Sequence, residues 1–436
     1  KGNFDGIGIE FRMVKDTIIV IRTIPGGPSE KVGLMPGDRI VKVNDTTVAG
    51  NDVPTDSIVS MLKGERNTKV DVSVYRRGNK GLLDFTITRG EIPTYSLDVS
   101  YMVNNQIGYV KLNKFSATTS DELHEALKEL KGKQMTKLIL DLRGNGGGYL
   151  SESIEVADEF LKDGELIVYT EGKNRPVRKK HATGDGLFQE GELVVLIDEM
   201  SASASEIVAG AIQDNDRGTI IGRRSFGKGL VQEQMKLKDG SAIRLTVARY
   251  HTPSGRSIQR PYKPGDSKDY YMDFLRNMEN DNKDSAKDSM VDSSKVYTTS
   301  DGDTVYGGGG IFPDIYVPRE EGLANDLTQK LIRAGIIFRF AFQYADDHRD
   351  DFKRFADAHD FVENFEVQPA LFGQLKAFAV QNGIQGEEKE YEEAKPLIKS
   401  RLKAFIGRNF FDDDAFYPVI HKVDVEFQKA LNYLDE

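Results

Sequence analysis

Three segments of the sequence carry residues whose types and spacing could do chemistry. Ser203 lies in the middle of the serine-rich run 201–206, and Lys228 lies between two glycines in the mostly apolar stretch 225–232. A serine hydroxyl is a poor nucleophile until a neighbouring base takes its proton, and a desolvated lysine can serve as that base. The third segment, 144–148, is glycine-rich. Together these residue types could carry out acyl transfer by a serine nucleophile.

Two further features fit this chemistry. Gln232 follows Lys228 by four residues, so a helical turn there would place both on one face and let the amide orient the amine. Glycines at 146–148 bring bare backbone N–H groups close to a ligand. Such donors stabilise the oxyanion of acyl transfer by roughly 3–4 kcal/mol each.

Each feature also has a purely structural interpretation. Ser203 and Glu206 have the spacing of a helix capping box, which is an ordinary way to begin a helix. Lys228 could be a solvated loop residue. The glycine run could form a phosphate site or a plain tight turn, and His251, at a strand end, could replace Lys228 as the base.

The elements around these segments indicate how they are positioned. Apolar runs at 138–142 and 193–198 predict buried strands that lead directly into the glycine and serine corners, and helices are expected at 151–161 and 207–213. Ligands and catalytic groups of α/β folds collect at the carboxyl ends of the strands. We therefore expect both corners to lie at one sheet edge.

The chain divides into three expected domains. Residues 1–90 are β-rich, with strands at 18–21, 40–43 and 70–75, a short helix capped by Ser29, and a second helix at 56–62. Residues 91–320 alternate as an α/β domain does, with a polar, mobile insertion at about 266–300. Residues 321–436 have apolar positions near helical spacing and predict an all-α domain.

These segments resemble the signature of the carboxyl-terminal processing peptidases, or tail-specific proteases, which are Ser–Lys serine endopeptidases. The motif residues are the run 140–148, the run 201–206, the run 226–232 and Gly310-Ile311-Phe312-Pro313-Asp314. The resemblance implies that Ser203 is the nucleophile, Lys228 the base and Gln232 its partner. It also implies an oxyanion hole at the N–H groups of Ala204 and of Gly147 or Gly148.

The resemblance extends to the N-terminal part, which is similar to a PDZ domain. Gly6, Ile7, Gly8 and Ile9 would form the loop that binds a terminal carboxylate, because successive backbone N–H groups make an anion-binding nest. The implied fold class is α/β multidomain: a PDZ β-sandwich-like domain, a crotonase/ClpP-like α/β peptidase core and a C-terminal all-α domain. Relatives usually carry a leader and a helical segment upstream, and the shortest lack the helical tail.

Composition excludes several function classes. The net charge of −10 argues against nucleic-acid binding, which needs a basic face. The sequence contains no run of about 18 apolar residues, which is the length that would predict a membrane span. Without cysteines, neither disulfides nor thiolate zinc sites are available, and the spacing of His348 and His359 suits no standard zinc set. We expect neither a metal nor another cofactor.

Three functions remain at this stage. The first is a serine endopeptidase that acts on protein or peptide substrates with free C-termini, for which a homo-oligomer is one expected assembly. The second is a catalytically silent PDZ scaffold that binds tails, and the third is an acyl-CoA enzyme of the crotonase type. The chain begins at Lys1 without a leader, so we expect a mature or trimmed form. The family implies a periplasmic or cell-envelope location.

Overall fold

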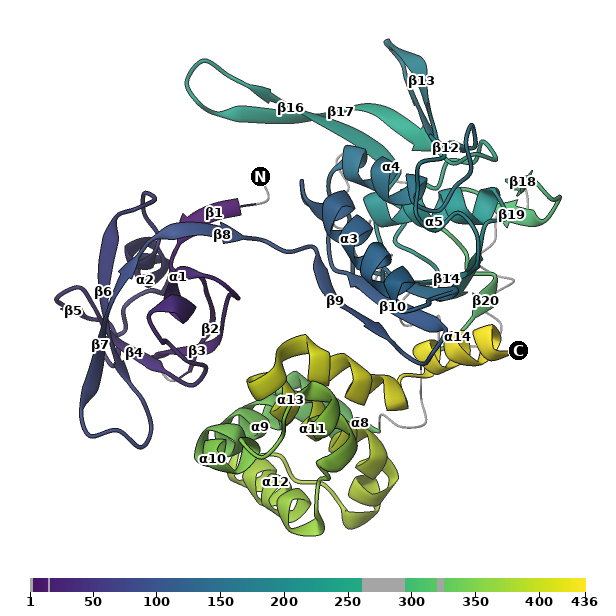
Figure 1. Ribbon diagram of the computed structural model, residues 1–436. Helices are drawn as coiled ribbons and strands as arrows, with labels where there is room; N and C mark the ends of the chain where they lie inside the picture. Colours follow the sequence, from purple (N-terminus) through teal and green to yellow (C-terminus); the bar gives the residue numbers. More distant parts are fainter. Residues whose placement is uncertain (1–2, 15, 261–294, 320–324) are drawn as a thin grey trace. The chain divides into compact units, whose positions relative to one another are not determined.

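A computed structural model describes residues 3–14, 16–260, 295–319 and 325–436. The chain forms two compact units, Lys1–Thr94 with Gly322–Val423 and Tyr95–Glu321 with Asp424–Glu436 (Figure 1). The expected domain limits at 90 and 320 stay predictions, and the second unit additionally includes the last residues of the chain. Of the insertion expected at 266–300, residues 266–294 lie outside the described part of the chain.

A six-stranded sheet forms the centre of the second unit. All neighbouring strands are parallel except for β9 and β10, which form an antiparallel pair at one edge of the sheet. In spatial order the strands are β20 (Ile315–Tyr316), β15 (Thr219–Gly222), β14 (Glu192–Ile197), β11 (Lys137–Asp141), β10 (Ile107–Leu112) and β9 (Leu97–Met102). The strands at 138–142 and 193–198 were predicted from their apolar runs, and both are confirmed.

Helices cover both faces of this sheet, which explains why its strands are continuously apolar. On one face lie α3 (Thr119–Gly132), α4 (Leu150–Asp158) and α5 (Ala204–Asp214), and on the other lies α14 (Val425–Asp435) (Figure 1). Alternate residues of β11 and β10 serve the two sides: Leu138 and Leu140 join the main core, whereas the Tyr109 ring contacts Phe427 of α14 with centroids 5.6 Å apart. The final helix therefore completes the core of this unit.

A second, antiparallel sheet belongs to the same unit. Its order is β13 (Arg175–His181), β12 (Leu166–Gly172), β17 (Ala242–His251) and β16 (Leu230–Lys236). Strands β16 and β17 form a long hairpin (Figure 1). A separate two-stranded ribbon joins β18 (Val296–Thr298) and β19 (Thr304–Tyr306).

The first unit combines a β-rich part with a helical part. The β-rich part has the strand order β2 (Ile9–Met13), β3 (Ile18–Thr23), β4 (Arg39–Val43), β6 (Lys69–Tyr75) and β7 (Leu82–Thr88), with β5 (Thr46–Thr47) beside β4. A second ribbon pairs β1 (Asn3–Gly6) with β8 (Gly90–Pro93). The helices of this part are α1 (Pro28–Lys31) and α2 (Thr55–Leu62).

One local expectation here is wrong. Helix α1 begins after Gly27, and Ser29 lies inside it rather than at its cap. Proline is favoured at the first helical position, so Pro28 starts the helix earlier than the serine would. The Ser29 hydroxyl instead donates to the carbonyl of Ile7 at 2.6 Å and fixes the loop before β2.

The remainder of the first unit is helical, as expected from its apolar spacing. The helices are α8 (Asp326–Arg333), α9 (Ile336–Asp347), α10 (Arg349–Phe352), α11 (Ala358–Asn364), α12 (Pro369–Gln381) and α13 (Glu388–Ile420), followed by the 3₁₀ turn η1 (His421–Val423). Their shared core is rich in phenylalanine. Within the described ranges, no helix is both long and apolar enough to cross a bilayer.

Candidate active site

Ser203 lies at the head of α5, immediately beyond the carboxyl end of β14, and its backbone is strained. Its φ of 57° and ψ of −108° belong to a region that glycine tolerates and other residues avoid. Such strain costs of order 1–3 kcal/mol and persists when the surroundings enforce it. Every residue of α5 is buried, so the helix that carries Ser203 is a rigid platform.

Glu206 enforces this geometry by joining the serine corner to the lysine loop. Its carboxylate Oε2 accepts the backbone N–H groups of Ser203 and of Lys228, each at 2.8 Å. Its Oε1 accepts the Ser225 hydroxyl and the Gly227 N–H, each at 2.6 Å. Burial raises the pKa of Glu206 above its ordinary value, although these four donors oppose the shift.

These bonds hold the backbone N–H groups of Ser203 and Lys228 close together. Tyr250 makes a similar link between the backbone carbonyls of the same two residues. The Tyr250 hydroxyl lies 3.1 Å from the Ser203 carbonyl and 2.5 Å from the Lys228 carbonyl. Lys228 itself is half-buried. In the described part of the chain, no hydrogen bond joins the Ser203 hydroxyl to the Lys228 amine, so the two backbones are adjacent while the side chains are not yet engaged.

The glycine corner lies against the serine corner. A Cβ added to Gly147, whose φ is +90°, would come within 2.8 Å of both the Ser203 Cβ and the Ala204 nitrogen. A Cβ on Gly148 would lie 1.9 Å from the carbonyl oxygen of Phe115. Both positions therefore require glycine. The close approach at Gly147 places the backbone of this loop directly beside Ser203 and Ala204.

The three candidate oxyanion donors differ in whether they are free. The Gly147 N–H already donates to the Asn145 side-chain oxygen at 2.9 Å. Among the residues that the structure describes, no acceptor is found for the N–H of Gly148 or of Ala204. Ala204 is the first residue of α5, where N–H groups have no partner within the helix. Ala204 and Gly148 are the pair available to an incoming oxyanion.

Gln232 does not have the local structure that we expected. Residues from Leu230 onward form strand β16 rather than a helical turn, and Gln232 is exposed opposite Thr246 of β17. A register shift occurs between Val231 and Gln232, where the strand is irregular. The spacing argument from a helical face therefore fails, and its role as the partner of Lys228 stays a prediction.

Comparisons with known proteins identify related families for three parts of the chain. Residues 106–268 match peptidase family S41, residues 6–87 match the PDZ domain, and residues 327–412 match a family of unknown function. Residues 106–268 therefore form a domain that matches peptidase family S41, and we call it the S41 domain. The resemblance seen in the sequence is confirmed, as is the fold class: a PDZ domain, an S41 core and a helical C-terminal region.

Two relatives illustrate the similarity. A carboxy-terminal-processing protease of Bartonella bacilliformis is 40% identical over 263 residues, which are 59% of this chain and 60% of the relative. Carboxy-terminal processing protease CtpA of Bacillus subtilis is 35% identical over 260 residues, 60% of this chain and 55% of the relative. The chain thus spans little more than half the length of either relative. A solved photosystem II D1 C-terminal processing protease is 28% identical, with 75% of each chain covered and a TM-score of 0.38.

The loop 6–9 of the PDZ domain has the features of an anion nest. Gly8 has a φ of +74°, and the carbonyls of Ile7 and Gly8 are occupied by the N–H groups of Ser29 and Ile24, each at 3.0 Å. In the described residues, no acceptor is found for the N–H groups of Ile7 and Gly8. Strand β2, which follows the loop, is an edge strand of its sheet. It can therefore accept an added strand.

A buried ionic network, which sequence reasoning missed, supports the glycine corner of the S41 domain. Asp141 pairs with Arg143 at 2.6 Å and with Lys111 at 3.1 Å. Burial works against the Asp141 carboxylate, but Arg143 and Lys111 outweigh it and lower the pKa of Asp141. Arg143 continues the network to Glu426 of α14 at 2.5 Å.

Glu426 also pairs with Arg223, the residue two positions before Ser225 of the lysine loop. A single carboxylate of α14 thus pairs both with Arg143, next to the glycine corner, and with Arg223, next to the lysine loop. The amphipathic pattern of residues 425–435 indicates a buried face, but nothing local in the sequence indicates which sheet covers it. Glu426 could not have been found from motif spacing.

His251, the rival base, makes structural contacts. Its ring stacks on Tyr169 with centroids 4.8 Å apart, and its Nδ1 lies 3.2 Å from the carbonyl of Gly255. Asp214, at the end of α5, forms a fully buried ion pair with Arg256 at 2.6 Å. These contacts fix the far end of the helix whose head carries Ser203.

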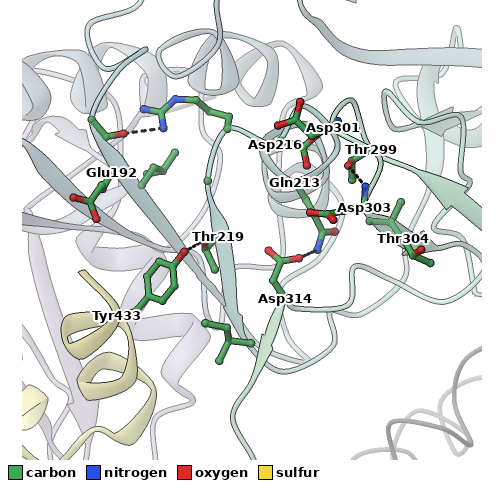
Figure 2. Close-up of a pocket in the computed structure, with 16 residues that line it drawn as sticks. Glu192, Gln213, Asp216, Thr219, Thr299, Asp301, Asp303, Thr304, Asp314 and Tyr433 are labelled. Carbon is green, nitrogen blue, oxygen red and sulfur yellow. Dashed lines mark hydrogen bonds between the residues drawn. The ribbon is translucent and has the colours of Figure 1, made fainter. Parts of the chain in front are cut away.

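A polar cavity of about 650 Å³ lies elsewhere in the S41 domain (Figure 2). Glu192 and Thr219, which line it, begin strands β14 and β15, so the cavity lies at the amino ends of the strands. Asp314, from the closing motif 310–314, accepts the Gln213 amide at 2.6 Å and the Ile220 N–H at 2.7 Å. Burial raises the pKa of Asp314. This aspartate ties α5 to β15 on the side opposite to the candidate active site.

Proposed function

We propose that the protein is a serine endopeptidase that receives substrate C-termini on its PDZ domain and cleaves peptide bonds with Ser203 and Lys228. The observation that carries the proposal is the strained backbone of Ser203, held by Glu206 to the loop that bears Lys228. Strain of this kind is retained where function needs it.

In the proposed reaction, an uncharged Lys228 amine takes the proton of the Ser203 hydroxyl as its oxygen attacks the peptide carbonyl. The N–H groups of Ala204 and Gly148 receive the developing oxyanion. Lys228 then gives its proton to the leaving amine, and the freed peptide departs. Water, deprotonated by the same amine, attacks the acyl-enzyme, and the Lys228 ammonium returns that proton to the Ser203 oxygen as the new carboxyl product leaves. The scheme uses groups of the chain alone.

Substrate recognition is proposed to begin at the PDZ domain. A terminal carboxylate would accept the N–H groups of the loop 6–9, and the tail would pair with the open edge of β2. The kind of partner that this fits is a protein or peptide with a free and flexible C-terminus. A periplasmic or cell-envelope location and a homo-oligomeric state are part of the same proposal and are drawn from the family.

The test is digestion of a disordered protein, followed by mass spectrometry of the products. Wild type is expected to release fragments, and Ser203→Ala and Lys228→Ala are expected to release none. Fragments produced by Ser203→Ala at the wild-type rate would refute the assignment of the nucleophile. A folded wild type that binds tails without cutting any substrate would instead favour the silent PDZ scaffold. EDTA is expected to leave the rate unchanged.

A further inference from the structure

A small cavity lies between the PDZ domain and the helical part of the same unit. Its volume is about 120 Å³, and it is lined by residues of β2, β3, α9 and α13: Glu10, Phe11, Arg12, Ile21, Arg22, Phe338, Phe405, Arg408 and Asn409. Three of its lining residues, Glu10, Phe11 and Arg12, belong to β2, the edge strand to which a bound tail would be added. The helical residues belong to the segment that matches a family of unknown function.

Ion pairs join the PDZ domain to the helical part, and one of them includes Arg22, which lines the cavity. Arg22 of the PDZ domain pairs with Asp413 of α13 at 3.4 Å, and Arg39 pairs with Asp346 of α9 at 3.1 Å. The cations come from the PDZ domain and the carboxylates from the helices. The cavity is therefore walled by both parts.

The charged side chains Glu10 and Arg12 of the cavity differ in whether a side chain of opposite charge pairs with them. Glu10 is paired with Arg22 at 2.7 Å, so its carboxylate is neutralised. The Arg12 guanidinium lies over the Phe338 ring, 3.9 Å from its centroid. In the described ranges, no carboxylate pairs with Arg12. A guanidinium stacked on an aromatic ring keeps its N–H edge available for a carboxylate.

The position of Arg12 relative to a bound tail follows from strand geometry. With its carboxylate at the N–H groups of Ile7 and Gly8, the tail must run antiparallel to β2. Side chains directly opposite each other point to the same face. In that register the second residue from the C-terminus lies opposite Glu10, and the fourth lies opposite Arg12.

We propose that this cavity is a side-chain pocket for substrate tails. It would select an acidic residue at the fourth position from the C-terminus. Arg12 would bind the carboxylate, and Phe338 of the helical part would hold Arg12 in place. The helical part would thus contribute to the sequence specificity with which the PDZ domain binds tails. This inference rests on the proposed recognition of tails.

The test uses the full chain with Ser203→Ala and labelled ten-residue peptides that differ only at the fourth position from the C-terminus. Fluorescence anisotropy is expected to show about fivefold tighter binding of the Glu peptide than of the Gln peptide at low salt, because an exposed ion pair contributes up to about 1 kcal/mol. Arg12→Gln is expected to abolish this ratio, and Phe338→Leu to reduce it. Lys80→Gln, an exposed cation in the β6–β7 turn, is the matched control and should retain it.

The outcomes separate this inference from the function on which it rests. If peptides with an amidated C-terminus bind as tightly as free acids, recognition of tails itself is refuted. If the free carboxylate is required but the Glu and Gln peptides bind equally, the pocket alone is refuted. A ratio that survives Arg12→Gln overturns the role of Arg12, and a ratio untouched in a folded Phe338→Leu variant overturns the role of the helices.

Discussion

The link made by Glu206 leads to a quantitative prediction for Glu206→Gln. The substitution keeps the shape of the side chain but replaces one acceptor oxygen by an NH₂ group. Whichever oxygen is lost, two of the four donors face that group: either the N–H groups of Ser203 and Lys228, or the Ser225 hydroxyl and the Gly227 N–H. The first outcome breaks the link between Ser203 and Lys228, and the second keeps that link but releases Ser225 and Gly227 from Glu206.

The magnitude follows from those two lost bonds. Hydrogen bonds to a charged acceptor contribute about 1.5–3 kcal/mol each, so their loss costs roughly 3–6 kcal/mol. Burial raises the pKa of Glu206, which means that the buried charge is itself costly, and removing it offsets part of the loss. We expect a net destabilisation of about 2–4 kcal/mol, within the ordinary stability of a domain. The catalytic rate should fall by at least about a hundredfold, because either outcome weakens the support that positions the two reacting groups.

The assay is urea unfolding followed by circular dichroism, together with peptidase rates measured where the variant is fully folded. Glu155→Gln on α4 is the matched control, because that side chain is exposed and its loss should change stability by less than about 0.5 kcal/mol. A Glu206→Gln protein with the wild-type unfolding free energy and the wild-type rate would refute the reasoning.

Three further predictions follow from the same site. Ser203→Gly should be inactive yet more stable than Ser203→Ala by about 1 kcal/mol in thermal unfolding, because glycine accepts the strained backbone; an equal or lower stability would contradict the strain. Glu426→Gln should lower kcat by about tenfold or more while KM changes less, since the bases of both corners are loosened; the control is the exposed Glu436→Gln, and an unchanged kcat would exclude the bridge. Because the folded pKa of Asp141 is lowered, its stabilisation is present above its ordinary pKa and is lost as pH falls below about 4, so wild type should lose unfolding free energy toward acid more steeply than Asp141→Asn; parallel pH profiles would count against this.

The features that sequence predicted well are those set by local pattern. Apolar runs gave the buried strands at 138–142 and 193–198, and the spacing of Ser203 and Glu206 predicted the capping interaction that the Ser203 N–H makes. Ser29 was assigned as a cap because serine is common there, and Pro28 displaced it. In each case the neighbouring residues decide the outcome.

The features that sequence could not predict depend on distant partners. The segment after Lys228 became a strand because residues 242–251 pair with it, and that pairing overrides any local tendency to turn. Glu206 was recognised as a capping residue, but its two bonds to residues 227 and 228 arise from a loop about twenty positions away. The positive φ of Ser203 has no signature in residue type.

The placement of residues 424–436 has a consequence for how the protein is made. The chain passes from one unit to the other at 94, again at 321 and a third time at 423. A ribosome therefore completes the PDZ domain, the sheet strands and the helical part before Glu426 is synthesised. Until then, Arg143 and Arg223 lack the partner that they share, although Asp141 and Glu199 already pair with them. The support that Glu426 gives to the glycine corner and to the lysine loop can therefore form only after the chain has been made as far as residue 426.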